Sequence, residues 1–249
     1  MQEPRCNRGS LFGGVRPTRN DMRICGEKKE ATFLERATRF SALVELQGRE
    51  ELAHLPNSGR LGELLTLGRR VIVVERSGSH RKTRYDLIMA YLKDKLVSVD
   101  ARLPGSLVYE ALLRGALPQF NGYSFVRREA TYGQSRLDFL LGSAPPCLLE
   151  VKSVTLVREG VAMFPDAPTS RGLRHLRTLM EARREGYRAA VLFVIQREDA
   201  DCFSPNDEAD PDFGSTLREA ALSQVDVYAH LCTLTEDEVQ LARAVPIRL

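Results

Sequence analysis

The sequence has no tryptophan, few histidines and no long apolar run among its 249 residues. A bilayer-spanning helix needs about 20 apolar residues, and no segment approaches that length. Residues 1–30 also lack the apolar core of a secretory signal. The absence of tryptophan removes the usual stacking platform of a sugar-binding module. The lack of a membrane-spanning segment and of a secretory signal argues against a membrane protein and favours a cytoplasmic location.

The five cysteines and four histidines are scattered along the chain. They show no CxxC, HxH or HExxH spacing, which argues against a structural zinc site and against a zinc hydrolase. An odd number of widely spaced cysteines favours reduced thiols over a disulfide framework.

The net charge of +3 is concentrated near the N-terminus. Residues 1–31 contain seven Lys or Arg against four Asp or Glu, and the rest of the chain balances with 29 of each sign. Any affinity for nucleic acid must therefore come from local basic patches and not from a global positive field.

The chain divides into three segments by pattern. Residues 1–31 are rich in Arg, Gly and Pro and lack periodicity, which predicts a disordered basic tail, with Met22 as an alternative start. Short alternating runs separated by turn residues predict a small β-barrel over 32–99. Helical and strand patterns then alternate, which predicts an α/β domain over 100–249. One helix is expected to begin at Ser106.

The stretch LDFLLGSAPPCLLEVKS, residues 137–153, places charges inside two apolar runs. If the runs pair as a hairpin about the Gly/Ser/Pro break, Asp138 lies opposite Glu150 on one face. Lys152 lies two residues further along that face, opposite Arg136. Opposed side chains have Cβ atoms only about 4.5–5.5 Å apart, and like charges there repel. We therefore expect a cation close to the two acids.

Two kinds of cation could stabilise this pair of acids. Lys152 and Arg136 could neutralise it on a solvent-facing strand, which is a common structural arrangement. Alternatively, Mg²⁺ binds one or two carboxylates together with waters and phosphate oxygens. A lysine beside such a site suits metal-assisted phosphodiester cleavage, because it can assist the attacking water or neutralise developing charge. The spacing alone leaves both possibilities open.

The order of these charged residues resembles the PD-(D/E)xK nuclease superfamily, with Asp138 followed by Glu150-Val151-Lys152 and preceded by a helix that carries Glu110. Five longer stretches are similar to the sugar fermentation stimulation protein family: HLPNSGRLGELL, RKTRYDLI, SRLDFLL, LLEVKSVTLV and FPDAPTSRGLRHL. The likeness runs from about residue 33 to about residue 235.

The resemblance implies a DNA-binding protein linked to the regulation of sugar catabolism. Its fold would be mixed α/β, with an N-terminal OB-like β-barrel and a C-terminal restriction-endonuclease-like domain. Asp138, Glu150 and the Val151 backbone carbonyl would hold Mg²⁺ or Mn²⁺. Lys152 would be the catalytic or phosphate-neutralising lysine, and Glu110 an outer acid. The alternative is a non-catalytic DNA-binding regulator whose acidic cluster is structural or vestigial.

The FPDAPTSRGLRHL stretch has two prolines ahead of a predicted helix. Asp166, Thr169 or Ser170 can cap this helix, which is the simplest role for the stretch. The resemblance supports a second role, in which Asp166, Thr169 and Arg171 lie beside the metal site and helix N–H groups face a phosphate. Both roles stay open.

Basic residues that could contact phosphate fall into two groups, although a solvated charged face is the simplest explanation for each. Aromatic residues near the barrel group are few, namely Phe40, Tyr85 and Tyr91, so double-stranded DNA is favoured over single strands. His175 is expected to be a structural or exposed histidine and not a general base. The basic candidates are Arg171, Arg174 and Arg177 on the helix and Arg60, Arg81, Lys82 and Arg84 in the barrel.

Overall fold

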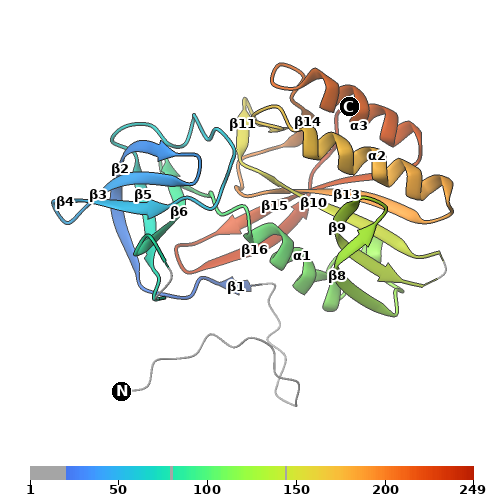
Figure 1. Ribbon diagram of the computed structural model, residues 1–249, viewed down its shortest axis with the longest axis horizontal. Coiled ribbons are helices and arrows are strands. Elements are labelled where there is room, and N and C mark those ends of the chain that lie inside the picture. The colour runs from blue at the N-terminus through green and yellow to red at the C-terminus, as the bar shows by residue number, and fades with distance from the viewer. Residues whose placement is uncertain (1–20, 79–80, 144) are drawn as a thin grey trace, which may run out of the picture.

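The computed structural model describes residues 21–78, 81–143 and 145–249. Two parts lie side by side in it, a β-barrel and a larger α/β domain (Figure 1). Among the described residues, no helix has the length and apolar character needed to cross a bilayer.

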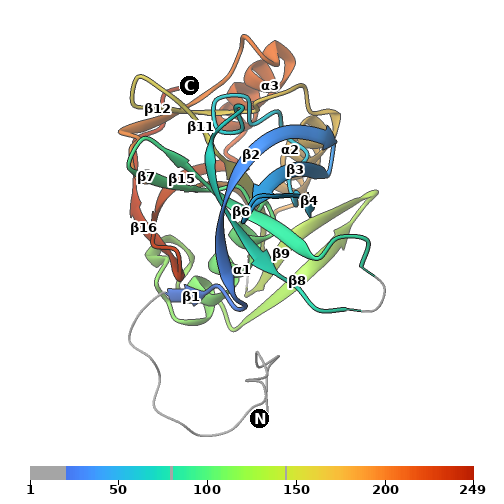
Figure 2. The same cartoon turned by 90° about the vertical axis from the view of Figure 1, so that its left-hand side faces the viewer.

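The barrel confirms the OB-like architecture expected for the first part of the chain. Its strand order is β4-β3-β2-β5-β6-β7, and a short parallel pairing of β4 with β6 closes it. Alternate residues such as Phe33, Val44 and Val73 point inward and are buried. Figure 2 shows the molecule with the barrel facing the viewer and the long strand β2 curving across it. The strands are β2 (Lys28–Thr38), β3 (Ser41–Leu46), β4 (Arg49–His54), β5 (Arg70–Glu75), β6 (Tyr85–Leu92) and β7 (Lys95–Ser98).

A seven-stranded mixed sheet forms the centre of the second domain, in the order β1-β16-β15-β13-β10-β9-β8. The neighbours β10, β13 and β15 run parallel, and the outer pairs are antiparallel. This arrangement confirms the α/β class. The strands are β1 (Asp21–Arg23), β8 (Phe125–Tyr132), β9 (Ser135–Gly142), β10 (Cys147–Val154), β13 (Arg188–Ile195), β15 (Asp226–Leu234) and β16 (Glu238–Ala244).

Helices cover both faces of this sheet, as Figure 1 shows. Helix α1 (Leu103–Leu113) packs through Leu107 and Val108 on the face that carries Leu149. Helices α2 (Ser170–Arg184) and α3 (Pro211–Leu222) share the core on the opposite face with β10 and β13. A small sheet of β11 (Leu156–Arg158), β12 (Val161–Phe164) and β14 (Cys202–Pro205) leads from β10 toward α2.

Two expectations from the sequence are wrong. Residues 21–31 are not a disordered tail, because β1 pairs with β16 and β2 begins at Lys28; residues 1–20 lie outside the described chain. Helix α1 begins at Leu103 and not after Ser106, since Pro104 suits the first helical turn. The thiols of Cys147, Cys202 and Cys232 are free.

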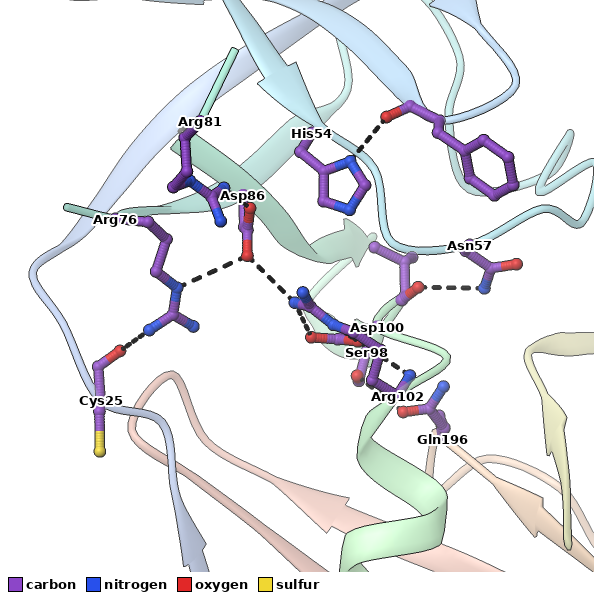
Figure 3. Close-up of polar contacts among 12 residues, drawn as sticks. Cys25, His54, Asn57, Arg76, Arg81, Asp86, Ser98, Asp100, Arg102 and Gln196 are labelled. Carbon is purple, nitrogen blue, oxygen red and sulfur yellow. Dashed lines mark hydrogen bonds and ion pairs between the residues drawn. The ribbon is translucent and has the colours of Figure 1, made fainter. Parts of the chain in front are cut away.

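Buried ion pairs join the barrel to the second domain. The carboxylate of Asp86, on β6, is almost fully buried and pairs with Arg81 and with Arg102, which precedes α1, at 3.0 Å; Arg76 lies at 3.6 Å (Figure 3). Burial alone would raise the pKa of Asp86, but hydrogen bonds from Arg102 and Arg81 outweigh burial and hold this pKa below its usual value. Ionised Asp86 therefore stabilises the junction.

A second set of contacts crosses the same junction. Arg197, 2% exposed, donates to Glu63 of the barrel at 2.7 Å and to the Thr155 carbonyl at 3.0 Å. Ser98 at the end of β7 donates to Gln196 at 2.8 Å, and Gln196 donates in turn to Ser153 at 2.8 Å. These bonds connect the barrel directly to the ends of β10 and β13.

Replacing Asp86 tests the first of these contacts. We expect Asp86→Asn to lower the free energy of unfolding by roughly 3 kcal/mol at pH 7, because it removes the buried carboxylate charge that Arg81, Arg102 and Arg76 share. A depressed carboxyl pKa contributes stability above the unfolded value, and this contribution is lost as the pH falls through the folded value. The difference from wild type should therefore shrink below about pH 4.

Urea unfolding at several pH values measures this effect. Asp94→Asn is the matched control, because Asp94 is exposed at the β6–β7 turn, and it should change stability little. Equal stability of Asp86→Asn and wild type at pH 7 would contradict a stabilising role for the ion cluster.

Candidate metal and nucleic-acid site

The hairpin of β9 and β10 has the register that the sequence predicts. Leu141 pairs with Cys147, and Phe139 pairs with Leu149. The next positions in this register are Asp138 and Glu150, so the two acids meet where the ladder ends. Asp138 Oδ2 accepts a hydrogen bond from the Val151 backbone N–H at 2.7 Å.

Glu150 is the buried centre of the site, at 3% exposure. Its Oε1 atom accepts from Lys152 Nζ at 2.6 Å and is also hydrogen-bonded to the ring of His175 on α2. Its Oε2 atom is buried and has no hydrogen-bond partner in the described part of the chain. A buried carboxylate oxygen without a partner is costly. The position of Oε2 therefore favours an additional donor or a cation.

The partners of His175 determine which ring nitrogen carries the proton. Arg171 Nε lies 3.4 Å from His175 Nε2, and a guanidinium can only donate. Nε2 must therefore accept, which leaves the proton on Nδ1. The Nδ1–H then donates to Glu150 Oε1. Lys152 Nζ lies 3.3 Å from the same Nδ1 and must direct its protons to the carboxylate instead.

The two acids have opposite pKa shifts. Burial raises the pKa of Asp138 to about 6, and the negative charge of Glu150 adds to this effect, while the Val151 N–H and Lys152 oppose it. Burial would also raise the pKa of Glu150, but the charge of Lys152 and the hydrogen bond from His175 lower it overall. Glu150 is thus the ionised member, and Asp138 holds a proton below about pH 6.

This donor set fits a hard divalent cation. Asp138 and the unpartnered oxygen of Glu150 offer carboxylate ligands, and the Val151 carbonyl is the expected third ligand. Within the described ranges no group of three or more Asp, Glu, His or Cys is arranged to hold a metal. Mg²⁺ needs no such group, because it binds one or two carboxylates and keeps several waters. Zinc, which favours three or four nitrogen and sulfur ligands, does not fit.

Two residues expected near the acids lie elsewhere. Arg136 does not face Lys152, because β9 pairs with β10 only from Phe139 to Leu141, and Arg136 forms an ion pair with Glu129 at 2.8 Å. Glu110 lies on α1, which covers the other face of the sheet, and pairs with Arg114 at 3.2 Å. Glu110 is therefore not among the groups that the structure brings to the acid pair.

The FPDAPTS segment caps α2 and contacts the barrel. Thr169 Oγ1 accepts from the Gly172 N–H at 3.0 Å, so Thr169 is the N-cap. Asp166 Oδ2 accepts from the Leu61 N–H of the barrel at 3.2 Å, and a side chain at Gly59 would collide with this carboxylate. Asp166 therefore joins the two domains, which neither of its expected roles included.

The predicted basic residues have different environments. Arg171, Arg174 and Arg177 are exposed on α2, and Arg171 alone contacts the site, through His175. In the barrel, Arg81 is paired with Asp86 and Arg84 with Glu75, at 2.7 Å for the second pair. Lys82 is exposed, and exposed Arg60 lines a cleft between the domains.

Two neighbouring clefts lie between the barrel and the second domain, with volumes of about 400 and 230 Å³. Thr155, Leu156 and Asp166 line both of them. The smaller cleft extends from Arg39 and the barrel loop 57–59 to Ser153, the residue after Lys152, and to Thr169 at the start of α2. It therefore borders the elements that carry the acid pair, the lysine and His175.

His175 is the main site residue that the sequence reasoning missed. It is 1% exposed and lies between Arg171 and Glu150. The available signal was its spacing, since it follows Arg171 by one helical turn and adjoins the buried Leu176 on the helix face toward the sheet.

Comparison with known proteins agrees with both domains. The model of the SfsA N-terminal OB domain matches residues 34–99, and that of the sugar fermentation stimulation protein RE domain matches residues 102–238. The fold is similar to a solved structure of Pyrococcus furiosus SfsA in complex with Ca²⁺, with a TM-score of 0.85 and 30% sequence identity. The match covers 92% of this chain and 98% of that chain.

Curated relatives extend this similarity over most of the sequence. A sugar fermentation stimulation protein homolog of Caldanaerobacter subterraneus subsp. tengcongensis is 44% identical over 218 residues, which cover 87% of this chain and 95% of the relative. Another from Desulforamulus reducens is 46% identical over 227 residues, which cover 91% of this chain and 95% of the relative. The chain therefore belongs to the sugar fermentation stimulation protein family.

Proposed function

We propose that the protein binds DNA and hydrolyses its phosphodiester bonds with the help of Mg²⁺ or Mn²⁺. The observation that carries this proposal is the pair of half-buried Asp138 and buried Glu150, in which Glu150 Oε2 has no partner among the described residues. Lys152 lies within hydrogen-bond distance of the same carboxylate. Two acids and a lysine where the β9–β10 ladder ends supply the groups that metal-assisted phosphodiester cleavage requires.

A bound Mg²⁺ would polarise the scissile phosphate and lower the pKa of a water molecule. The carboxylates of Asp138 and Glu150 orient the cation site. Lys152 supplies positive charge for the attacking water or for the charge that develops on phosphate. His175 is hydrogen-bonded to Glu150 Oε1, which leaves Oε2 of the same carboxylate for the cation. Arg171 fixes the ring of His175.

Further features support a DNA substrate and a hard cation. Arg171, Arg174 and Arg177 present exposed positive charge on the helix that begins at the cleft, where phosphates can be contacted. The relative from Pyrococcus furiosus is described as a Ca²⁺ complex, and Ca²⁺, like Mg²⁺, prefers oxygen ligands. On this proposal the protein acts as a nuclease in the cytoplasm, and the barrel provides additional contacts to the nucleic acid.

A second candidate is a non-catalytic DNA-binding regulator linked to sugar catabolism. Lys152 is already paired with Glu150 and nearly buried, and Glu110 lies on the other face of the sheet. These two observations favour a structural role for the cluster, because the charges of Lys152 and Glu150 already neutralise each other without a bound phosphate.

Cleavage assays distinguish the two candidates. We expect wild type to cut linear, circular or single-stranded DNA with Mg²⁺ or Mn²⁺, and Asp138→Asn and Lys152→Ala to lose at least about 100-fold in rate. Both variants should bind DNA nearly as well as wild type in EDTA. Glu110→Gln is the matched control, because removing the Glu110 carboxylate from α1 should change the cleavage rate little. Absence of cleavage by wild type on all these substrates would leave the regulator.

The raised pKa of Asp138 predicts a pH dependence of cation binding. Below about pH 6 a proton competes with the cation, so calorimetric Ca²⁺ affinity should fall about tenfold per pH unit.

A raised carboxyl pKa also means that the cation-free protein loses stability as the pH rises from about 4 through the folded value. Asp138→Asn should remove this loss of stability. If the stability of the variant depended on pH as that of wild type does, Asp138 would not be the group with the raised pKa.

The role of His175 can be tested without measuring cleavage. An asparagine amide can replace the Nδ1–H donor, so His175→Asn should keep Ca²⁺ affinity close to that of wild type. His175→Leu removes the donor and should weaken Ca²⁺ binding about 10- to 100-fold. Calorimetry and the Ca²⁺-induced rise in Tm provide the measurements. Equal affinities of the leucine and asparagine variants would show that the hydrogen bond to Glu150 does not position the ligand.

A further inference from the structure

Phe40 is an aromatic side chain that the barrel holds in an exposed position. It lies in the β2–β3 turn with 49% of its surface exposed. Its N–H donates to Thr38 Oγ1 at 3.2 Å, and its carbonyl accepts from the Leu55 N–H at 2.8 Å and from the His54 ring at 3.0 Å. Figure 3 shows the His54 bond. The backbone is thus fixed while the ring stays in contact with solvent.

The other candidate stacking residues of the barrel are covered. Tyr85 is 3% exposed. The guanidinium carbon of Arg70 lies 3.6 Å from the centre of the Tyr91 ring, and the hydroxyl of Tyr91 is bonded to Glu236 of the other domain. Within the described part of the barrel, Phe40 therefore remains as the aromatic ring with a free face.

Arg39 connects this ring to the cleft between the domains. Its guanidinium carbon lies 5.4 Å from the Phe40 ring centre, and its carbonyl accepts from Arg36 Nη2 at 2.7 Å. Arg39 lines the smaller cleft together with Ser153 and Thr169. No ion pair is formed by the Arg39 guanidinium with any described carboxylate. A positive charge beside an exposed ring is thus available to a ligand that enters this cleft.

The chemistry around Phe40 favours a nucleobase over an apolar protein surface. Residues 37–39, which precede it in the turn, are exposed and include a hydroxyl and a guanidinium. A protein partner would need a contiguous apolar patch, whereas one aromatic ring with an adjacent arginine suits a stacked base and its phosphate. Arg60 lines the neighbouring cleft and offers a second phosphate contact.

We propose that Phe40 stacks on one unpaired nucleotide of DNA, that Arg39 binds its phosphate, and that the strand then follows the cleft toward Lys152. This inference rests on the proposed DNA binding and specifies its substrate class as duplex DNA with a single-stranded extension. The earlier prediction of double-stranded DNA thus becomes a duplex with one unpaired nucleotide bound at Phe40. The single ring stacks on that base, and the exposed arginines of α2 contact the duplex.

The test compares a blunt duplex with the same duplex carrying a short single-stranded extension that contains 2-aminopurine. Dissociation constants are measured by fluorescence anisotropy in EDTA, so that no cleavage occurs, and stacking is measured by 2-aminopurine quenching. Wild type should bind the extended duplex roughly tenfold more tightly than the blunt one, a typical effect of one base–aromatic stack. Quenching should accompany binding.

Three variants isolate the contribution of the ring. Phe40→Ala should lose both the preference and the quenching while it binds blunt duplex as wild type does. Phe40→Trp should keep both. Leu67→Ala is the matched control, because Leu67 is also exposed in the barrel, at 79%, and lines neither cleft. The thermal midpoint of each variant reports whether it remains folded.

Three results would overturn the inference. Equal affinity of wild type for both duplexes would remove the single-stranded extension from the substrate while leaving the proposed DNA binding intact. A preference that survives in Phe40→Ala would place the unpaired base on another residue. Failure of wild type to bind either duplex would instead overturn the proposed function together with the inference.

Discussion

The burial of one charged carboxylate organises the candidate site. Glu150 lies between β13 and the end of β9, under α2, where an ionised group is stable only if positive or donor groups surround it. Lys152 and His175 satisfy one oxygen, and Arg171 fixes the histidine tautomer that can donate. The other oxygen and the carboxylate of Asp138 then remain for a cation. The contacts that keep Glu150 ionised in the interior thus also determine which of its oxygens is left without a partner among the described residues.

The relation between the two domains also depends on polar groups that are removed from water. Arg197 donates to Glu63 of the barrel, and Gln196 connects Ser98 to Ser153. Breaking such buried pairs is costly, because each leaves a charge or a donor without a partner. The barrel is therefore held against the end of β10, and the clefts between the domains are built features of one folded unit.

Local patterns in the sequence were sufficient to predict the hairpin and to limit the cap of α2 to Asp166, Thr169 or Ser170, of which Thr169 is the N-cap. The break between two alternating runs determines the register of β9 and β10, and a threonine before a helix is a strong N-cap signal. Long-range contacts were not predictable. The partner of Asp21 is Gln240, and the contact of His175 with Glu150 requires α2 to pack on β10. The position of Arg136 was predicted wrongly because β9 pairs with β10 only from Phe139 to Leu141, which no local pattern indicates.

The arrangement of the cleft links the two proposals physically. Ser153 follows Lys152 in β10, and Thr169 begins the helix that carries Arg171 and His175; both residues line the cleft that Arg39 also lines. A strand held at Phe40 would therefore run along elements whose positions the buried network of Glu150 already fixes. Preorganisation of this kind reduces the entropy lost when a flexible strand binds. The exposed ring beside Arg39, which lines the cleft, and the carboxylate cluster next to Ser153 thus favour a single path for the strand.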